Sequence, residues 1–363
     1  MRHISLIGCG LMGGSLGLSL LEHHPDLRIT GWDASDTLET AIRRGAITDA
    51  AESLEEAVRD ADLVVLATPL YTAISLVEEL AAVLPEGAWV HDLCSVKMPM
   101  ADAVRRFLPH HVYVGGHPMT GSEKAGIRHA DSALYENATY VLCPPTIGVD
   151  PAGYARLQSL LQSTGARLLE MTPEAHDRVA SRVSHLPQML SVLLVNLAAE
   201  SRQQDPEVLR LAAGGFRDMT RIASSPFRMW SDILDGNRAE ASAALESFSS
   251  LLARMMDDLR DGNLEAIGER FRLAEQTRNF IPADSKGFLK PLADVFVFTP
   301  DKPGALVELT TTLYKAELSI KDIELLRIRE NTGGTFRLGF DSAAEADQAV
   351  SALQSTGFTA YRL

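Results

Sequence analysis

The chain has 363 residues, of which 46% are hydrophobic and 23% are charged, a balance typical of a globular protein. A chain of this length is longer than a domain with a single hydrophobic core usually is, so two or three domains are expected. The formal net charge of -14 argues against binding to nucleic acid or to an anionic membrane, because either would need clustered Lys and Arg.

The first predicted strand, Arg2 to Ile7, is followed at once by a glycine-rich loop and an apolar helix. The loop has the pattern GxGxxG, which binds the pyrophosphate of a dinucleotide when it lies between a strand and a helix. Its glycines permit a tight turn, a close approach of the phosphates and close packing of helix on strand. We therefore predict a Rossmann-type doubly wound sheet with a dinucleotide bound at Gly8, Gly10, Leu11, Met12 and Gly13.

The second predicted strand, Leu27 to Trp32, ends at Asp33, which lies 20 positions after Gly13. An acidic side chain there would bind the ribose hydroxyls and would repel a 2′-phosphate, which favours NAD over NADP. Arg43 and Arg44 come further along, and we expect both to face solvent. The alternative is a glycine-rich turn that binds no nucleotide.

Two more predicted strands end in polar turns at the same rim of the sheet. After the first of them, Thr68 and Pro69 should touch the cofactor. The next strand, Ala88 to Leu93, leads to Ser95 on the rim. Lys97, just beyond, either holds an anion or simply begins a helix.

The stretch Val114 to Lys124 holds three glycines and the dipeptide His117-Pro118. A His beside a Pro is held on a rigid turn, and its imidazole titrates near neutrality, so it can accept a proton from an alcohol. We predict that His117 is catalytic. The alternative is a capped loop in which His117 only satisfies backbone groups.

The first domain is expected to end near Met171. Thr139 to Cys143 reads as a strand, Pro151 to Gly165 as a helix, and Arg167 to Met171 as the last strand of a domain covering 1–171. Thr172 as the N-cap and Pro173 at the first helical position then predict the start of a helix.

An all-helical substrate and dimerisation domain is predicted over 172–284. Its first helix, Ala175 to Glu200, is interrupted at Pro187, which lacks an N–H and leaves the carbonyl of Val183 without its usual partner. We expect a kink or local opening there, with His185 and Gln188 in a pocket wall. A kink that serves packing alone is the alternative.

A second polar cluster follows in the same domain. Gly214 should bring the backbone close to another group, and Arg217, Asp218 and Arg221 place charge beside it, with Trp230 nine positions later. Arg suits a bidentate grip on a carboxylate. We expect one arginine to pair with Asp218 and the other to bind substrate.

Two helices, Arg238 to Asp261 and Leu264 to Arg278, complete this domain, and their spacing of Leu, Met and Phe indicates a core or a subunit interface. A polar linker, Pro282 to Lys290, follows. A third domain over 291–363 has the order strand, helix, strand, strand, helix, strand, a ferredoxin-like pattern. The turn after its first strand offers backbone N–H groups to a small carboxylate, at Asp301, Pro303, Gly304 and Ala305.

The cysteines and the apolar segments bear on the compartment. Cys9, Cys94 and Cys143 are widely spaced and lack metal-ligand spacing, so we expect reduced, buried thiols and no metal site. We see no signal-peptide pattern at the first residues. The most apolar helix, Met189 to Ala199, is too short to span a bilayer. We expect a soluble cytoplasmic protein with no membrane partner.

Taken together, these residues resemble the prephenate dehydrogenase family with a C-terminal ACT regulatory domain, over essentially the whole length. Each motif alone is modest, but their order and spacing are specific. They are GCGLMGGSLG from Gly8, ATP at Ala67–Pro69, DLCSVK at Asp92–Lys97, GGHPMTGSEKAG at Gly115–Gly126, SHLPQ at Ser184–Gln188, GGFRDMTRIA with Trp230, and DKPGAL at Asp301–Leu306.

The resemblance implies oxidative decarboxylation of prephenate by NAD, which gives 4-hydroxyphenylpyruvate, carbon dioxide and NADH. His117 matches the family's catalytic His, which accepts a hydrogen bond from the ring 4-hydroxyl, and Ser95 matches the residue that holds this hydroxyl and His117. Arg221 matches the arginine that binds a substrate carboxylate, while Gly214 and Trp230 match pocket positions.

One position departs from the family pattern. Many members have His where this chain has Gln188, and that position is associated with substrate selection and tyrosine sensitivity. An arogenate dehydrogenase or a dual-specificity cyclohexadienyl dehydrogenase is therefore an alternative. By resemblance, an amino-acid effector, tyrosine, would bind the ACT domain of a homodimer.

Two more distant readings are weaker. A β-hydroxyacid dehydrogenase would need a catalytic Lys in the helical domain, whereas 172–281 contains none. A non-catalytic sensor of NAD and an amino acid would leave His117, Ser95 and Arg221 without a role.

Overall fold

The computed structural model describes residues 1–121, 124–144, 150–280, 292–329 and 333–362. They form two compact units, Met1–Arg278 and Asn279–Leu363, each with its own sheet. The predicted linker, Pro282 to Lys290, lies outside the described residues, as do Ser122 and Glu123 of the predicted catalytic stretch.

The first unit is built on an eight-stranded sheet with the order β3-β2-β1-β4-β5-β6-β7-β8. All pairings are parallel except that of β6 with β7. The predicted doubly wound sheet is confirmed, and the strand order reverses at β1 and β4, where such sheets bind ligands. The strands are β1 (His3–Ile7), β2 (Arg28–Trp32), β3 (Asp49–Ala50), β4 (Leu63–Leu66), β5 (Trp89–Asp92), β6 (Val112–Pro118), β7 (Thr139–Cys143) and β8 (Arg167–Glu170).

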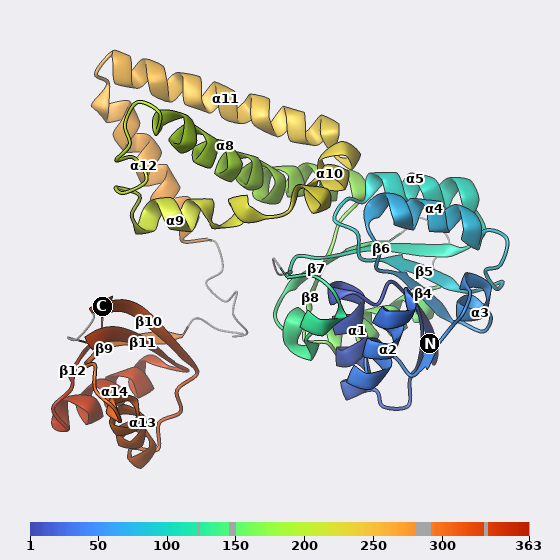
Figure 1. The fold of residues 1–363 in the computed structure, drawn as a ribbon, viewed down its shortest axis with the longest axis horizontal. Coiled ribbons are helices and arrows are strands. Elements are labelled where there is room, and N and C mark those ends of the chain that lie inside the picture. The colour runs from blue at the N-terminus through green and yellow to red at the C-terminus, as the bar shows by residue number, and fades with distance from the viewer. Residues whose placement is uncertain (122–123, 145–149, 281–291, 330–332, 363) are drawn as a thin grey trace. The chain divides into compact units, whose positions relative to one another are not determined.

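Helices cover both faces of this sheet (Figure 1). Leu16 of α1 and Leu157 of α6 belong to one apolar cluster, and Val77 of α4 and Val104 of α5 belong to a second. The central strands are continuous apolar runs because both of their faces are buried. The helices are α1 (Leu11–His23), α2 (Ser35–Arg44), α3 (Leu54–Val58), α4 (Leu70–Leu80), α5 (Met98–Phe107) and α6 (Pro151–Gln162).

The chain beyond β8 is helical and begins as predicted. Thr172 caps α7 by accepting the N–H of Ala175 at 3.2 Å. The predicted opening before Pro187 is a π-helical turn over Ser181–His185. No helix of the described part of the chain is long and apolar enough to cross a membrane. The helices are α7 (Pro173–Ala180), α8 (Leu186–Ser201), α9 (Gly214–Thr220), α10 (Phe227–Gly236), α11 (Arg238–Arg260) and α12 (Leu264–Arg278).

The second unit has a four-stranded antiparallel sheet with the order β10-β11-β9-β12. Its core joins Val295 of the sheet to Leu309 and Ala346 of the two helices. The predicted succession of strands and helices is confirmed in this unit. The elements are β9 (Ala293–Thr299), α13 (Ala305–Lys315), β10 (Asp322–Arg329), β11 (Gly333–Phe340), α14 (Ala343–Ser355) and β12 (Thr359–Tyr361).

Candidate active site

The GxGxxG loop has the geometry that its glycines predict. Gly8 has a φ of +95°, and a Cβ on Gly13 would lie 2.0 Å from the carbonyl oxygen of Gly8. A Cβ on Gly10 would meet nothing within 4 Å, so the loop is open on that side. Gly10 is the N-cap of α1 and supplies no side chain, which leaves the N–H groups of Leu11 and Met12 at an uncapped helix start.

Asp33 and Thr68 flank this loop from the ends of β2 and β4. The carboxylate of Asp33 accepts the backbone N–H of Cys9 at 2.7 Å. A Cβ on Gly8 would lie 2.9 Å from Thr68, so Thr68 adjoins the loop, and its buried hydroxyl has no partner among the described residues. Pro69 follows as the N-cap residue of α4. Asp33 and Thr68 therefore adjoin the glycine-rich loop, and Pro69 follows Thr68 at the start of α4.

Arg44 is exposed, as expected, but its guanidinium also contacts a distant part of the chain. Its guanidinium donates to the backbone carbonyls of Ile127, Arg128 and Ala130 at 2.8, 2.6 and 2.6 Å. Arg43 is also exposed, and within the described residues its one hydrogen bond is donated to Thr40 on its own helix. Arg44 thus anchors the segment around residues 127–130, more than 80 positions away, and no local pattern in the sequence indicates this contact.

The segment that Arg44 binds, residues 127–135, also makes two hydrogen bonds to the first part of α1. The hydroxyl of Ser15 accepts the N–H of Asp131 at 2.9 Å. The buried Tyr135 donates its hydroxyl to the carbonyl of Met12 at 2.7 Å. Because this segment follows β6, it links the GxGxxG loop to the strand that carries His117.

A buried ion pair fixes the strand beside His117. Lys97 and Asp92 have fully buried side chains and contact each other directly. Lys97 also donates to the carbonyl of Gly116 at 2.5 Å, and Tyr113 donates to Asp92 at 2.7 Å. Burial alone would raise the pKa of Asp92, but the Lys97 ammonium and these hydrogen bonds hold it below its ordinary value. Lys97 therefore holds a carboxylate of its own chain and is also the N-cap residue of α5.

His117 lies at the end of β6, with only 9% of its surface exposed. Its Nδ1 lies 2.7 Å from Nε2 of His176, whose Nδ1 lies 2.7 Å from the carboxylate of Asp177. Burial lowers the pKa of His117 well below its ordinary value, and the neighbouring His176 and Lys97 act in the same direction. The imidazole is therefore neutral near neutral pH and able to accept a proton.

His176 and Asp177 were missed at the sequence level. They follow the Thr172 cap in α7, 59 and 60 positions after His117. The only signal was an adjacent His-Asp pair in the first turns of a helix. Ser95 is half-buried, and within the described residues no hydrogen bond joins its hydroxyl to His117.

The π-helical turn and α8 contribute two buried polar groups. His185 packs edge-to-face on the ring of Trp230, with 6.0 Å between ring centroids, and burial lowers its pKa to about 4. Gln188 donates to the carbonyl of Ile222 at 3.0 Å. The indole N–H of Trp230 is buried without a partner in the part of the chain that is described, as is the hydroxyl of Ser191. A buried unpaired donor of this kind fits a polar ligand.

The polar cluster on α9 is exposed. Gly214 opens the helix, and a Cβ on it would meet nothing within 4 Å. Arg217 and Arg221 are also exposed, and the expected ion pair of one of them with Asp218 is absent from the described residues. Gln188 of α8 binds the backbone carbonyl of Ile222, the residue after Arg221.

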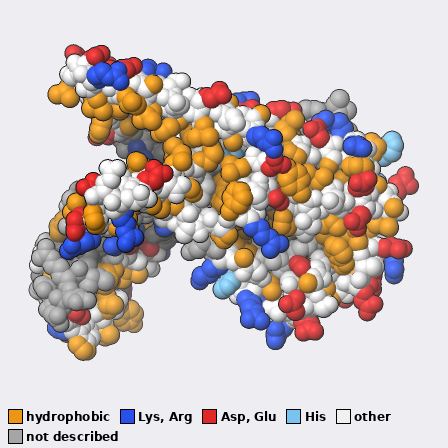
Figure 2. All heavy atoms as spheres, turned by 45° about the horizontal axis from the view of Figure 1, so that its top comes forward, with side chains coloured by type: hydrophobic (Ala, Val, Ile, Leu, Met, Phe, Trp, Pro, Cys, Tyr) orange, Lys and Arg blue, Asp and Glu red, His pale blue; other side chains and the backbone are white. Residues whose placement is uncertain are grey.

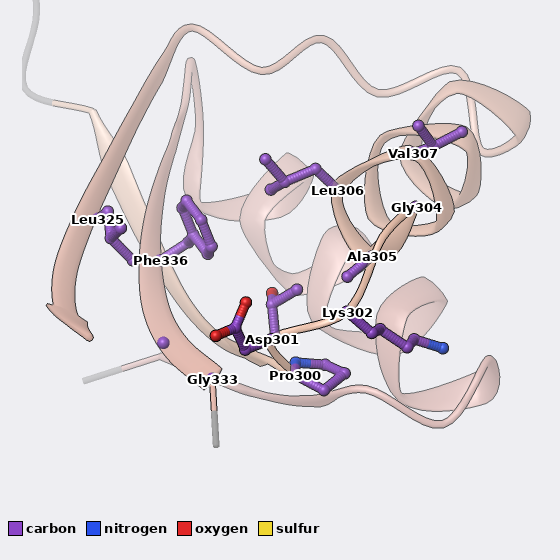
Figure 3. Close-up of a pocket in the computed structure, with 12 residues that line it drawn as sticks. Pro300, Asp301, Lys302, Gly304, Ala305, Leu306, Val307, Leu325, Gly333 and Phe336 are labelled. Atoms are coloured by element: carbon purple, nitrogen blue, oxygen red, sulfur yellow. The ribbon is translucent and has the colours of Figure 1, made fainter. Parts of the chain in front are cut away.

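The second unit contains a pocket of about 350 Å³ after β9. Figure 3 shows Asp301, Leu306 and Phe336 around it. The buried hydroxyl of Thr299 lines the pocket and has no partner among the described side chains. Gly304, with a φ of +85°, starts α13 at its edge. Of the four residues predicted here, Asp301, Gly304 and Ala305 line the pocket, and Pro303 does not.

The three cysteines are buried and free, as expected. Burial raises the pKa of Cys9 and of Cys143 to about 12 and raises that of Cys94 well above its ordinary value. The thiols are therefore protonated near neutral pH.

Comparisons with known proteins agree with this geometry. Residues 16–170 match the family model of the prephenate dehydrogenase nucleotide-binding domain, and residues 172–273 match that of the prephenate dehydrogenase dimerization domain. The chain is 35% identical to prephenate dehydrogenase of Bacillus subtilis, over 97% of this chain and 95% of that protein.

Solved structures give the same picture. A crystal structure of prephenate dehydrogenase from Aquifex aeolicus, in complex with hydroxyphenyl propionate and NAD+, is similar with a TM-score of 0.71 and 30% identity. It covers 78% of this chain and 99% of its own. The arogenate dehydrogenase of Synechocystis follows, with a TM-score of 0.68, 27% identity, and coverage of 76% and 99%.

Proposed function

Because the chain belongs to the prephenate dehydrogenase family, we propose that it oxidises prephenate with NAD to 4-hydroxyphenylpyruvate and carbon dioxide. The observation that carries the proposal is the buried, neutral His117 on a strand linked to an open GxGxxG loop. It supplies a proton acceptor beside a dinucleotide site, which is what this oxidation needs.

The residues of the loop fit NAD. Gly10 leaves space for the pyrophosphate at the start of α1, and Asp33 stands where the ribose hydroxyls would lie. The Asp33 carboxylate would repel the 2′-phosphate of NADP. When bound, NAD supplies the acceptor for a hydride from C4 of the substrate.

The other roles follow the family resemblance. Ser95 would bind the 4-hydroxyl together with His117. Arg221, exposed and without an ion pair among the described residues, is suited to bind a substrate carboxylate. The remaining pocket residues would be Gly214, Trp230, Gln188 and His185.

The test is NADH formation by the purified protein with prephenate and with arogenate, each with NAD and with NADP. Rapid turnover of prephenate with NAD is the expected result. Turnover of arogenate alone would instead favour an arogenate dehydrogenase, and comparable rates a cyclohexadienyl dehydrogenase. Gln188, which can donate and accept hydrogen bonds but carries no charge, would then be the first residue to exchange, as Gln188→His.

A homodimer is the proposed assembly. The helical part matches a model described as a dimerization domain, and large apolar side chains are exposed on it, among them Leu197, Leu252 and Phe271 at 61%, 49% and 69%. Figure 2 shows hydrophobic side chains gathered on this part of the surface. Such patches mark an interface. Sedimentation should give twice the chain mass, and Leu197→Glu should shift it toward the monomer.

The pocket of the second unit is proposed to bind tyrosine as an effector, in an ACT domain. The start of α13 and the Thr299 hydroxyl suit a carboxylate and an amine or hydroxyl, while Leu306 and Phe336 suit a ring. Calorimetry on the full chain should show tyrosine binding that Thr299→Val weakens. No binding of tyrosine, with turnover unaffected by it, would contradict the proposal.

A further inference from the structure

A line of three buried side chains leads from the start of α5 to the proposed proton acceptor. The two oxygens of Asp177 accept the backbone N–H groups of Lys97 and Met98 at 2.8 and 2.9 Å. Oδ1 also lies 2.7 Å from Nδ1 of His176. Asp177 and His176 are each only 2% exposed. Because the two backbone groups are donors, the ionised carboxylate fits this position.

These partners fix the hydrogen positions on both rings. With Asp177 as an acceptor, His176 carries its hydrogen on Nδ1, so a neutral His176 presents a lone pair at Nε2. That lone pair lies 2.7 Å from Nδ1 of His117. His117 must then carry its hydrogen on Nδ1, and its lone pair is on Nε2.

The other charged and titratable groups nearby do not replace this arrangement. The Lys97 ammonium is held in its own ion pair with Asp92. His185 contacts Asn237: the side-chain nitrogen of Asn237 lies 3.3 Å from Nδ1 of His185 and donates to the carbonyl of Asp177 at 2.8 Å. In contrast, the hydrogen bonds among the described residues connect Asp177 to His117 through His176.

We propose that His176, anchored by Asp177, is a positioning residue that keeps Nε2 of His117 free to accept a proton and shares the resulting positive charge. The inference rests on the proposed function for its chemistry. His176 acts through His117 and does not contact the substrate in this proposal.

The proposed step balances without another reactant. The 4-hydroxyl proton moves to Nε2 of His117 as the hydride leaves C4 for the nicotinamide. The His117 hydrogen at Nδ1 is drawn toward His176, and the ionised Asp177 stabilises the charge. The electrons of the bond to the departing carboxylate restore the aromatic ring, and Nε2 returns the proton to the phenol oxygen.

The experiment compares His176→Leu with His176→Gln, whose amide oxygen can still accept from Nδ1 of His117. We expect His176→Leu to lower kcat about 100-fold with little change in the KM for either substrate, and His176→Gln to recover about tenfold of that loss. His3→Gln is the matched control, because His3 also makes two hydrogen bonds, to Asp60 and Thr30. It is the first residue of β1, whereas the GxGxxG loop follows the last residue of this strand. The kcat of His3→Gln should stay near that of the wild type.

A second readout does not depend on turnover. Nitrogen-15 NMR of histidine-labelled protein, with the His117 signals assigned by their loss in His117→Asn, should show hydrogen on Nδ1 in the wild type. In His176→Leu it should move to Nε2. Unchanged kcat in His176→Leu, equal losses in both variants, or hydrogen on Nε2 of wild-type His117 would each overturn the inference. A wild type inactive on both cyclohexadienyl acids would overturn the proposed function, while the NMR result still decides this inference.

Discussion

The hydroxyl of Tyr135 donates a hydrogen bond of 2.7 Å to the backbone carbonyl of Met12. Met12 belongs to the GxGxxG loop, whereas Tyr135 follows the strand that ends beyond His117. Ser15 and Arg44 bind other residues of the segment that contains Tyr135. Changes here should therefore alter nucleotide binding and stability together.

Arg44→Ala tests this link. It removes three hydrogen bonds to backbone carbonyls, and since Arg44 is largely exposed we expect a loss of only about 1–2 kcal/mol in the free energy of unfolding. The KM for NAD should rise several-fold because the segment is released from the loop. Urea unfolding and steady-state kinetics measure both. Arg43→Ala removes a hydrogen bond to Thr40 and should change neither quantity, and equal effects of the two variants would contradict the role of Arg44.

His117→Asn should keep NAD binding and lose turnover. The amide cannot take up a proton, so we expect kcat to fall by at least about 100-fold. Fluorescence titration with NAD and rates of NADH formation separate the two effects. A kcat within a few-fold of the wild type would remove His117 from the reaction.

Stability should fall as the pH drops below neutrality. Burial lowers the pKa of His91 and of His185 to about 4 and lowers that of His117 well below its ordinary value. Between about 6.5 and the folded value, the unfolded chain binds a proton that the folded chain does not, which costs at most about 1.4 kcal/mol per group and pH unit. The stability is complete above the unfolded pKa and is lost as the pH falls. Urea unfolding at about pH 7.5 and pH 5 measures it, and equal midpoints would refute this account.

Catalysis should tolerate acid better than an ordinary histidine allows. Only neutral His117 accepts a proton, and its lowered pKa keeps it neutral below the usual range. The acid limb of kcat/KM should therefore lie below about pH 6.5. A limb at or above that value would show that another group governs it.

The Asp92–Lys97 pair should be costly to break. Lys97→Met leaves a carboxylate buried without its cation, which we expect to lower the free energy of unfolding by about 3–5 kcal/mol. The double variant Asp92→Asn, Lys97→Met should recover part of this loss. As a control, Arg105→Ala breaks an exposed pair with Asp102 and should cost less than about 1 kcal/mol.

Arg221→Ala should act on the substrate rather than the cofactor. If its guanidinium binds a carboxylate, the KM for prephenate should rise by at least about tenfold, while the KM for NAD stays unchanged. Arg217→Ala offers a comparison four positions away. An unchanged KM for prephenate in Arg221→Ala would exclude Arg221 from the site.

Most of the fold could be predicted from local patterns in the sequence. The GxGxxG loop, the Thr172 cap and the opening before Pro187 each depend on a few adjacent residues, so their physical cause is visible in the sequence. The antiparallel pairing of β6 with β7 was not anticipated, because strand direction is set by how the chain returns between them.

The contacts that complete the site join distant positions. Arg44 binds carbonyls beyond residue 126, and His176 binds His117 from α7. Neither partner differs in type from an ordinary surface arginine or core histidine. Charge and hydropathy describe each residue singly, whereas these roles arise only from packing.

Because the three cysteines are buried, their reaction with a thiol reagent reports local opening of the folded chain. A protonated thiol closed off from solvent does not react with a disulfide reagent, so any labelling of the native protein must pass through an opened state. Cys9 lies inside the GxGxxG loop, with its backbone N–H held by Asp33. If NAD slows the labelling of Cys9 more than that of Cys143, then bound NAD suppresses opening at the loop, a result that needs no measurement of turnover.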